Sequence, residues 1–224
     1  MNLINLAKLI NYSFQYVTKT SELYNIDESH SLRHSMDVFH YANEIYQSEL
    51  ELSQIGKSQF VLSPFLQEQQ KIIFTSAILH DMCDKKYMDE KEGIELLKTS
   101  MKDHLTDHEL EVVCSIISTM SYSTVKKNGY PDLGIYNFAY HIVREADLLA
   151  AYDIERCVIY KMKQFSYTYL DALLEMKTLF ETRILLYISD NLFMTDYSKK
   201  KARELHNNCL KKLDEIDKIY YSLK

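Results

Sequence analysis

Apolar and polar residues follow one another along most of the chain with the spacing of amphipathic helices, and the pattern predicts an all-α protein of about eight helices. No internal repeat or low-complexity linker marks a second domain, so one helical domain is expected over residues 1–224. Loops are expected at 54–63 and 121–134. The helices are expected at about 3–24, from after 28–31 to 52, and at 65–83, 89–102, 106–120, 134–162, 167–188 and 196–223.

The helix expected at 65–83 is apolar on most sides at its centre, where Ile72, Ile73 and Phe74 are followed by 77–79. Such a helix is buried by its neighbours, so whatever follows it is held rigidly. Its expected start is Ser63-Pro64, because proline suits the first helical position.

Other helix starts carry capping signals. A serine within 28–31 can cap the second helix, and Thr106 with Glu109 has the spacing of a capping box. The chain has only four glycines and two prolines, too few for the many turns of a sandwich or barrel.

Composition narrows the class of protein further. The hydrophobic fraction of 46%, with 18 Tyr and 9 Phe, can fill a large core, and no segment reaches the length of a membrane span. The net charge of −6 argues against an extended nucleic-acid surface or an anionic membrane partner. Four separated cysteines without a Cys-x-x-Cys pair fit a reducing compartment, and the N-terminus lacks the features of a signal peptide. A cytoplasmic protein is therefore expected.

The candidate chemistry begins at His80-Asp81, where the apolar helix meets charged sequence. A carboxylate beside a buried helix end is costly to desolvate unless a cation or hydrogen-bond donors compensate it, and a divalent metal would do so. Two further residues complete a pattern: His34 near the start of the second helix, and Asp147 between Ala and Leu residues within a later one.

This ordered set, a His, a His-Asp pair and an Asp on three helices, resembles the HD-domain superfamily of metal-dependent phosphohydrolases. The resemblance implies that His34, His80, Asp81 and Asp147 bind one divalent metal inside a helical bundle. It covers about 27–188, with the terminal helices packed on that core.

Flanking segments are similar to a small branch of nucleotide pyrophosphohydrolases. The stretch 79–87, Leu-His-Asp-Met-Cys-Asp-Lys-Lys-Tyr, matches that branch, as do 116–123 and 143–149. One departure is Ala150, which stands where the branch has a further aspartate, so a role for that carboxylate is in doubt.

The expected cofactor follows from the ligand types. Two imidazoles and two carboxylates suit Mn best, with Fe, Co, Ni, Zn and Mg as alternatives. Such an ion activates a bound water for attack on phosphorus. Asp84, four residues after His80, would project from the same helix face if the helix persists, which makes it the first catalytic candidate. The family resemblance adds Asp89 as a second.

An anionic substrate needs local cations, because no glycine-rich phosphate loop is present. Lys86 and Arg144 are favoured, with Arg33 as a further candidate, and Tyr122 could stack on a base. Lys126 and Lys127 are interpreted as a solvated pair.

The remaining histidines leave one alternative open. His104 and His108 could bind a second ion, but a helix cap at Thr106 would break their shared face. The other four are interpreted as surface or core residues: His30, His40, His141 and His206.

The sequence thus predicts a metal-dependent phosphohydrolase acting on a nucleotide or related phosphorylated small molecule. A non-catalytic nucleotide-sensing module that keeps the metal site is the alternative, and a two-metal enzyme is a third hypothesis. Whether the chain forms a homodimer is left open.

Overall fold

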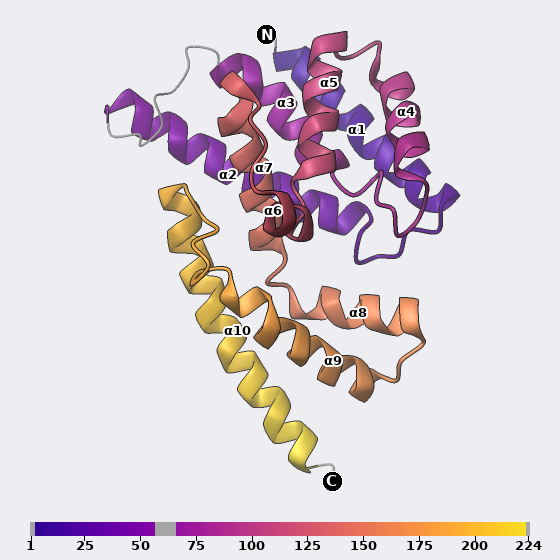
Figure 1. The fold of residues 1–224 in the computed structure, drawn as a ribbon, viewed down its shortest axis with the longest axis vertical. Coiled ribbons are helices and arrows are strands. Elements are labelled where there is room, and N and C mark those ends of the chain that lie inside the picture. The colour runs from indigo at the N-terminus through magenta and orange to yellow at the C-terminus, as the bar shows by residue number, and fades with distance from the viewer. Residues whose placement is uncertain (1–2, 57–65, 223–224) are drawn as a thin grey trace.

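The computed structural model describes residues 3–56 and 66–222, which form ten α-helices and two short 3₁₀-helices without a strand (Figure 1). The expected all-α fold is therefore confirmed. The elements are α1 (Leu3–Leu23), α2 (Leu32–Gln54), α3 (Leu66–Leu79), α4 (Glu90–Met101), α5 (Asp107–Thr119), α6 (Tyr122–Asn128), η1 (Gly134–Tyr136), α7 (Asn137–Ala150), α8 (Ile154–Phe165), α9 (Tyr169–Thr182), η2 (Ile184–Leu186) and α10 (Asp196–Ser222).

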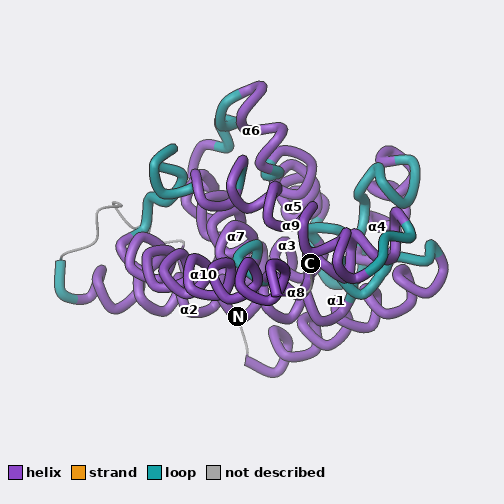
Figure 2. The backbone as a smooth tube through the Cα atoms, turned by 90° about the horizontal axis from the view of Figure 1, so that it is seen from below, coloured by secondary structure: helices purple, strands orange, loops and turns teal. Residues whose placement is uncertain are grey.

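Helix α3 lies at the centre of the core, as its apolar sequence predicts. It packs against α1, α2, α5 and α7, and α2 also packs along α7. Ile73, Ala77, Ile78 and Leu79 of α3 are fully buried. Figure 2 shows helices crossing one another, with most of the loops at the periphery. The residues after α3 therefore begin from a stem enclosed on several sides.

Helix α3 ends at Leu79, four residues before the expected end. Met82 N–H donates to the Leu79 carbonyl and Asp84 N–H to the Asp81 carbonyl, so two tight turns replace the last helical turn. His80 and Asp84 would share a helix face only if the helix persisted, and it ends before both residues. The expected loop at 54–63 and the Ser63-Pro64 helix start lie largely outside the described residues.

Three further segments differ from expectation. The helix expected at 167–188 ends at Thr182 as α9 and is followed by η2. The expected loop at 121–134 contains α6, which begins where the Ser121 side chain accepts a hydrogen bond from Thr124 N–H. The helix expected at 134–162 is divided into η1, α7 and α8, because Asp153 caps a new helix by accepting from Arg156 N–H. Helices α8 and α9 then pack against each other, below the α1–α5 region in Figure 1.

The expected caps have mixed outcomes. Thr106 and Glu109 form the capping box. Ser31 occupies the N-cap position of α2, but its side chain makes no capping hydrogen bond, so that prediction is right in position and wrong in chemistry.

All four cysteines are buried and free. Among the described helices, none has both the length and the apolar character needed to cross a membrane.

Candidate metal centre

Three helices that bury one another bring the predicted metal ligands together. His34 lies in the first turn of α2, His80 and Asp81 follow α3 directly, and Asp147 lies in the last turn of α7. Because α2, α3 and α7 pack pairwise, these segments meet although they are far apart in sequence. The four residues are called the His-Asp cluster below.

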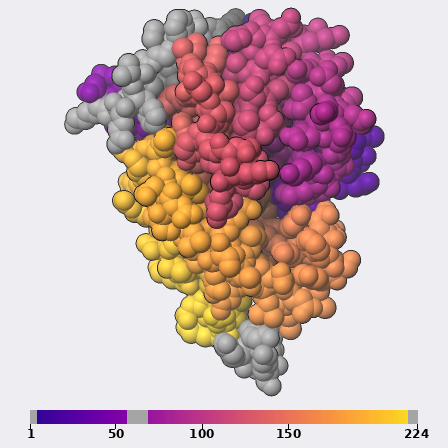
Figure 3. Space-filling model, viewed as in Figure 1, coloured from indigo at the N-terminus to yellow at the C-terminus, as the bar shows by residue number. Residues whose placement is uncertain are grey.

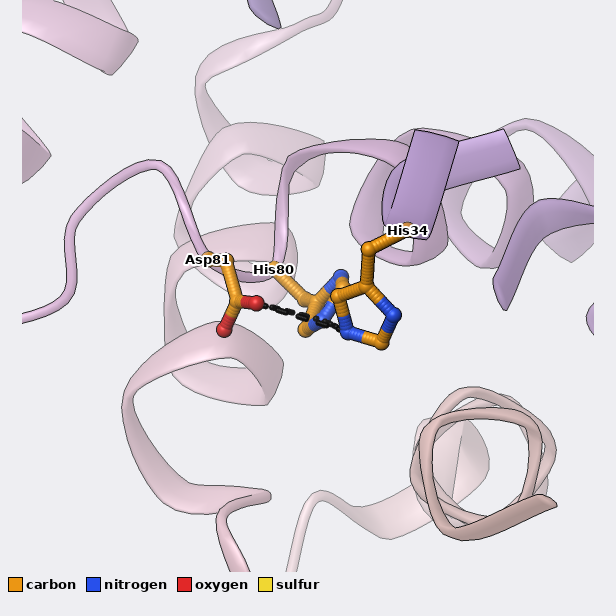
Figure 4. Close-up of side chains that lie close together, drawn as sticks. All are labelled: His34, His80 and Asp81. Atoms are coloured by element: carbon orange, nitrogen blue, oxygen red, sulfur yellow. Dashed lines mark hydrogen bonds and ion pairs between the residues drawn. The ribbon is translucent and has the colours of Figure 1, made fainter. Parts of the chain in front are cut away.

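The ligand atoms of the cluster converge. His34 Nε2 lies 3.4 Å from both Asp81 Oδ2 and Asp147 Oδ1, and 3.1 Å from His80 Nε2. His80 Nε2 lies 3.3 Å from Asp81 Oδ2 and 3.6 Å from Asp147 Oδ1. Figure 4 shows the Asp81 carboxylate and the two imidazole rings pointing toward one another.

These separations fit ligands that share an ion. Two atoms that each lie 2.0–2.2 Å from one metal are roughly 2.8–3.6 Å apart at bond angles of about 90–110°. Within the described part of the chain, His34, His80 and Asp81 form the one group of three potential ligands close enough to share an ion, and the distances above add Asp147.

Unsatisfied polar atoms give a second test of this fit. Asp81 Oδ2 is buried without a hydrogen-bond partner among the described residues. His80 Nδ1 lies 2.9 Å from the Ala77 carbonyl oxygen, which can only accept, so Nδ1 carries a proton. In the neutral ring, which is the form that binds a metal, this proton position leaves the lone pair of Nε2 facing the cluster. The residues present fit a divalent ion.

Burial and mutual charge set the protonation states of the cluster. Burial, with Arg156 nearby, lowers the pKa of His34 to about 3. Burial opposes the charge on His80, but the Asp81 and Asp147 carboxylates outweigh it and raise its pKa to about 9. Burial likewise opposes ionisation of Asp147, yet His34 and His80 lower its pKa to about 2.

The pKa of Asp81 is lowered, like that of Asp147. Burial disfavours its charge, and the neighbouring imidazoles, His80 first, hold the pKa of Asp81 well below its usual range. Near neutral pH the cluster therefore combines two carboxylates with one imidazolium and one neutral imidazole. The resulting single negative charge attracts a cation.

A cavity of about 320 Å³ opens beside the cluster and is called the cluster cavity. Its lining includes three cluster residues, His34, Asp81 and Asp147, together with Asp84 and Tyr122. Four cationic side chains also line it: Lys86, Arg156, Lys161 and Arg183. Figure 3 shows the orange α8–α9 region, which supplies three of these cations, adjoining the magenta elements on the same face.

Lys86 and Asp84 reach this cavity from the turns after α3. Lys86 N–H donates to Asp84 Oδ1 over 2.9 Å, and Lys86 Nζ lies 3.2 Å from Asp84 Oδ2. Lys86 Nζ is also 3.2 Å from His30 Nε2. The structure therefore brings Asp84 and Lys86 to the cluster cavity through turns rather than through a continued helix.

Arg156 and Arg183 were not predicted from the sequence. Arg156 lies in α8, where Nη1 donates to the Ser29 carbonyl over 3.2 Å and Nε is buried without a partner among the described residues. Arg183 follows α9, with its guanidinium carbon 4.6 Å from the centre of the Tyr122 ring. Neither residue belongs to a recognisable motif, and the α7–α8 break that positions Arg156 has no glycine or proline to signal it.

His30, interpreted above as a surface or core residue, also reaches the cluster cavity. It is buried, lines the cluster cavity and lies 2.6 Å from Ser29 Oγ through Nδ1. Burial, together with the nearby cations, lowers its pKa. His30 precedes α2 and its N–H closes a turn with the Asp27 carbonyl, so no helical spacing in the sequence indicates its position beside His34.

Three predicted residues lie away from the cluster cavity. Asp89 is exposed and caps α4 by accepting from Lys91 and Glu92 N–H, so its carboxylate has a structural partner. Arg33 is exposed and lines a neighbouring hollow, which shares His34 and Arg156 with the cluster cavity. Arg144 is buried with 2% exposure, because its guanidinium turns toward Glu145 and the Leu192 carbonyl instead of toward Asp147.

The other histidines have partners of their own. His104 stacks on Tyr12 at 4.2 Å, and His108 lies 3.1 Å from Tyr136 Oη, so the two rings do not share a ligand position. The remaining three are distributed as follows: His40 is exposed beside Glu44, His141 is buried against Tyr130, and His206 lies near Tyr152.

A second cavity of about 310 Å³ contains Arg144. Its walls are mainly apolar or aromatic and include Met120, Tyr122, Val125, Tyr130, Leu148 and Leu192. Tyr122 lines both cavities.

Comparison with known proteins bears on the fold. No protein-family model matches the chain, and no curated protein matches it in sequence. A crystal structure of a Lactobacillus plantarum protein, solved as a Northeast Structural Genomics target, is similar with a TM-score of 0.69 over 99% of both chains. Its sequence identity is 16%, so the similarity concerns the fold: the two chains share one helical architecture over nearly their whole length.

Proposed function

We propose that this protein is a metal-dependent phosphohydrolase that acts on a nucleotide or a related phosphorylated small molecule. The observation that carries the proposal is the convergence of the four ligand atoms of the His-Asp cluster on the wall of a cation-lined cavity. The order of these residues along the chain, and the stretch Leu79–Tyr87, also support membership of the HD-domain superfamily.

The His-Asp cluster would hold the ion, and its mixture of imidazole and carboxylate suits Mn, with Fe, Co, Ni, Zn or Mg as alternatives. When bound, a divalent ion lowers the pKa of a water ligand from about 16 toward 7 and polarises a phosphoryl oxygen. The side chains of the His-Asp cluster would hold the ion in a fixed place, because the helices that carry or precede them, α2, α3 and α7, pack against one another.

Lys86, Arg156 and Arg183 are proposed to bind the phosphate oxygens. All three line the cluster cavity, and Arg156 Nε is a buried donor without a partner among the described residues. Arginine can bind phosphate through two parallel N–H groups. These cations explain how a chain of net charge −6 could attract an anionic substrate.

Asp84 is proposed to accept or donate the proton of the attacking water or the leaving group. Its carboxylate lies at the cavity wall with about a fifth of its side chain exposed, and the Lys86 contacts fix its orientation. Oxygen lone pairs beyond those two contacts remain for a water molecule. Asp89 is assigned no part in this step, since its carboxylate caps α4.

A hydrolysis screen tests this function. Purified protein would be assayed with Mn²⁺, Co²⁺, Zn²⁺ and Mg²⁺ against nucleoside mono-, di- and triphosphates and simple phosphate esters. We expect turnover with at least one nucleotide, loss of turnover in Asp81→Ala, and retained turnover in the matched control Asp89→Ala. Turnover by metal-stripped Asp81→Ala protein, or none with any metal, contradicts the proposal.

A nucleotide-sensing module remains the alternative, and one observation favours it: both oxygens of Asp84 contact Lys86, so the carboxylate is already engaged. The Asp84→Ala variant separates the two functions. Loss of turnover with retained nucleotide binding supports the enzyme. Unchanged binding together with no effect on any activity supports the sensor.

A further inference from the structure

The second cavity lies next to the cluster cavity along α7. Asp147 lines the cluster cavity, while Arg144 and Leu148 of the same helix line the second. Residues three apart on a helix have Cβ atoms about 5–6 Å from each other. The two cavities, which also share Tyr122, are therefore within reach of one small molecule.

The walls of the second cavity suit a flat, largely apolar group. Tyr122 and Tyr130 provide two aromatic rings, and the apolar side chains around them include Met120, Val125 and Leu148. Such walls offer stacking and dispersion contacts, and the three charged side chains among them, Lys126, Arg144 and Asp190, include both signs. The volume of about 310 Å³ lies at the lower end of the usual range for small-molecule pockets.

Arg144 is the buried charged side chain in the wall of this cavity, whereas Lys126 and Asp190 are exposed. The side chain is 98% buried, its Nη2 donates to the Leu192 carbonyl over 2.6 Å, and its guanidinium lies 4.9 Å from the centre of the Tyr130 ring. Its Nε has no partner among the described residues. A buried donor without an acceptor is unfavourable, and a small rotation of the guanidinium would offer it to a ligand oxygen or ring nitrogen.

We propose that the second cavity binds the base of a nucleotide whose phosphates occupy the cluster cavity. A nucleobase combines a flat aromatic ring with hydrogen-bond acceptors, which matches the two tyrosines and Arg144. The inference rests on the proposed phosphohydrolase function for the phosphate end and adds a requirement for the base. Substrates without a base would lose these contacts and bind more weakly.

The kinetic test compares Tyr130→Ala with Tyr130→Phe and with the control Tyr169→Ala, an exposed tyrosine of α9 that lines neither cavity. Base stacking on an aromatic ring typically changes affinity by about tenfold or more. For a nucleoside triphosphate we expect KM to rise about tenfold in Tyr130→Ala, with kcat changed less than twofold. KM for inorganic tripolyphosphate should not change, and Tyr130→Phe should resemble the unaltered protein.

A binding test avoids turnover altogether. Equilibrium dialysis of adenosine, guanosine, cytidine and uridine would be run on Asp81→Ala protein with and without Tyr130→Ala. We expect at least one nucleoside to bind, and about tenfold more weakly when Tyr130 is replaced. Equal binding by both proteins, or binding of no nucleoside, overturns the inference.

The two proposals fail in different ways. Hydrolysis of tripolyphosphate as efficient as that of nucleotides, with KM unaffected in Tyr130→Ala, leaves the phosphohydrolase and overturns the base site. Nucleoside binding that depends on Tyr130, without hydrolysis of any phosphate compound, supports the base site and contradicts the phosphohydrolase.

Discussion

Replacing His141 with glutamine should make the unfolding free energy less sensitive to acid. His141 lies in α7 with 9% exposure, its ring 5.1 Å from that of Tyr130 and 5.3 Å from that of Tyr140. Burial, reinforced by the positive charge of Arg144, lowers its pKa to about 4. In the unfolded chain the pKa returns to about 6.5.

The sign follows from proton binding. Between pH 6.5 and 4 the unfolded chain carries a proton on His141 and the folded protein does not, so stability falls as the pH falls through this window. At about 1.36 kcal/mol per pKa unit, the full loss is about 3 kcal/mol, reached below pH 4. From pH 8 to pH 5 the loss is about 2 kcal/mol. Glutamine does not titrate, so this loss disappears in His141→Gln.

Urea unfolding followed by circular dichroism at pH 8, 7, 6 and 5, at constant ionic strength, measures the effect. Between pH 8 and pH 5 the unaltered protein should lose about 2 kcal/mol more than His141→Gln, whatever the variant's absolute stability. The control His40→Gln changes a side chain that is 69% exposed and should follow the unaltered protein. Parallel pH curves for His141→Gln and the unaltered protein would refute the reasoning.

Three further predictions concern metal, a cap and the core. Mn²⁺ at a hundred times its Kd should stabilise the protein by about 2.7 kcal/mol and raise Tm by about 5–11 °C. Thermal unfolding should show no such rise in Asp147→Ala, and an equal rise in that variant would contradict the prediction. Thr106→Ala removes the capping-box hydroxyl and should cost about 1 kcal/mol in urea unfolding, with Thr106→Ser close to the unaltered protein; equal losses in both would argue against the cap. Phe180→Ala empties a fully buried position and should cost about 3–5 kcal/mol, and a loss below about 1 kcal/mol would show that the ring is not packed as described.

The sequence carried strong information where the signal was local. The apolar run before His80 required a buried helix, and the His-Asp pair at its end required compensation for a desolvated carboxylate. The structure contains the buried helix, α3, and places Asp81 beside two imidazoles. His34 and Asp147 lie next to this pair because α2 and α7 pack on α3.

The cationic side of the cavity could not be predicted in the same way. Arg156 reaches the cavity because Asp153 starts a new helix, and the segment Ala151–Tyr152 before it has the composition of an unbroken helix. Arg144, by contrast, has favourable helical spacing to Asp147, but Glu145 and the Leu192 carbonyl hold its guanidinium elsewhere. Tertiary contacts decide both positions, and one sequence does not show them.

The break between α7 and α8 also divides the site between two kinds of structure. The His-Asp cluster is anchored in helices of the buried core, whereas Arg156, Lys161 and Arg183 belong to the α8–α9 hairpin, whose two helices pack chiefly on each other. A sequence change in the hairpin therefore leaves the cluster's supporting helices intact. On the proposed function, substitutions in the α8–α9 hairpin are expected to change substrate preference more than metal affinity, whereas substitutions in the core helices are expected to change metal affinity.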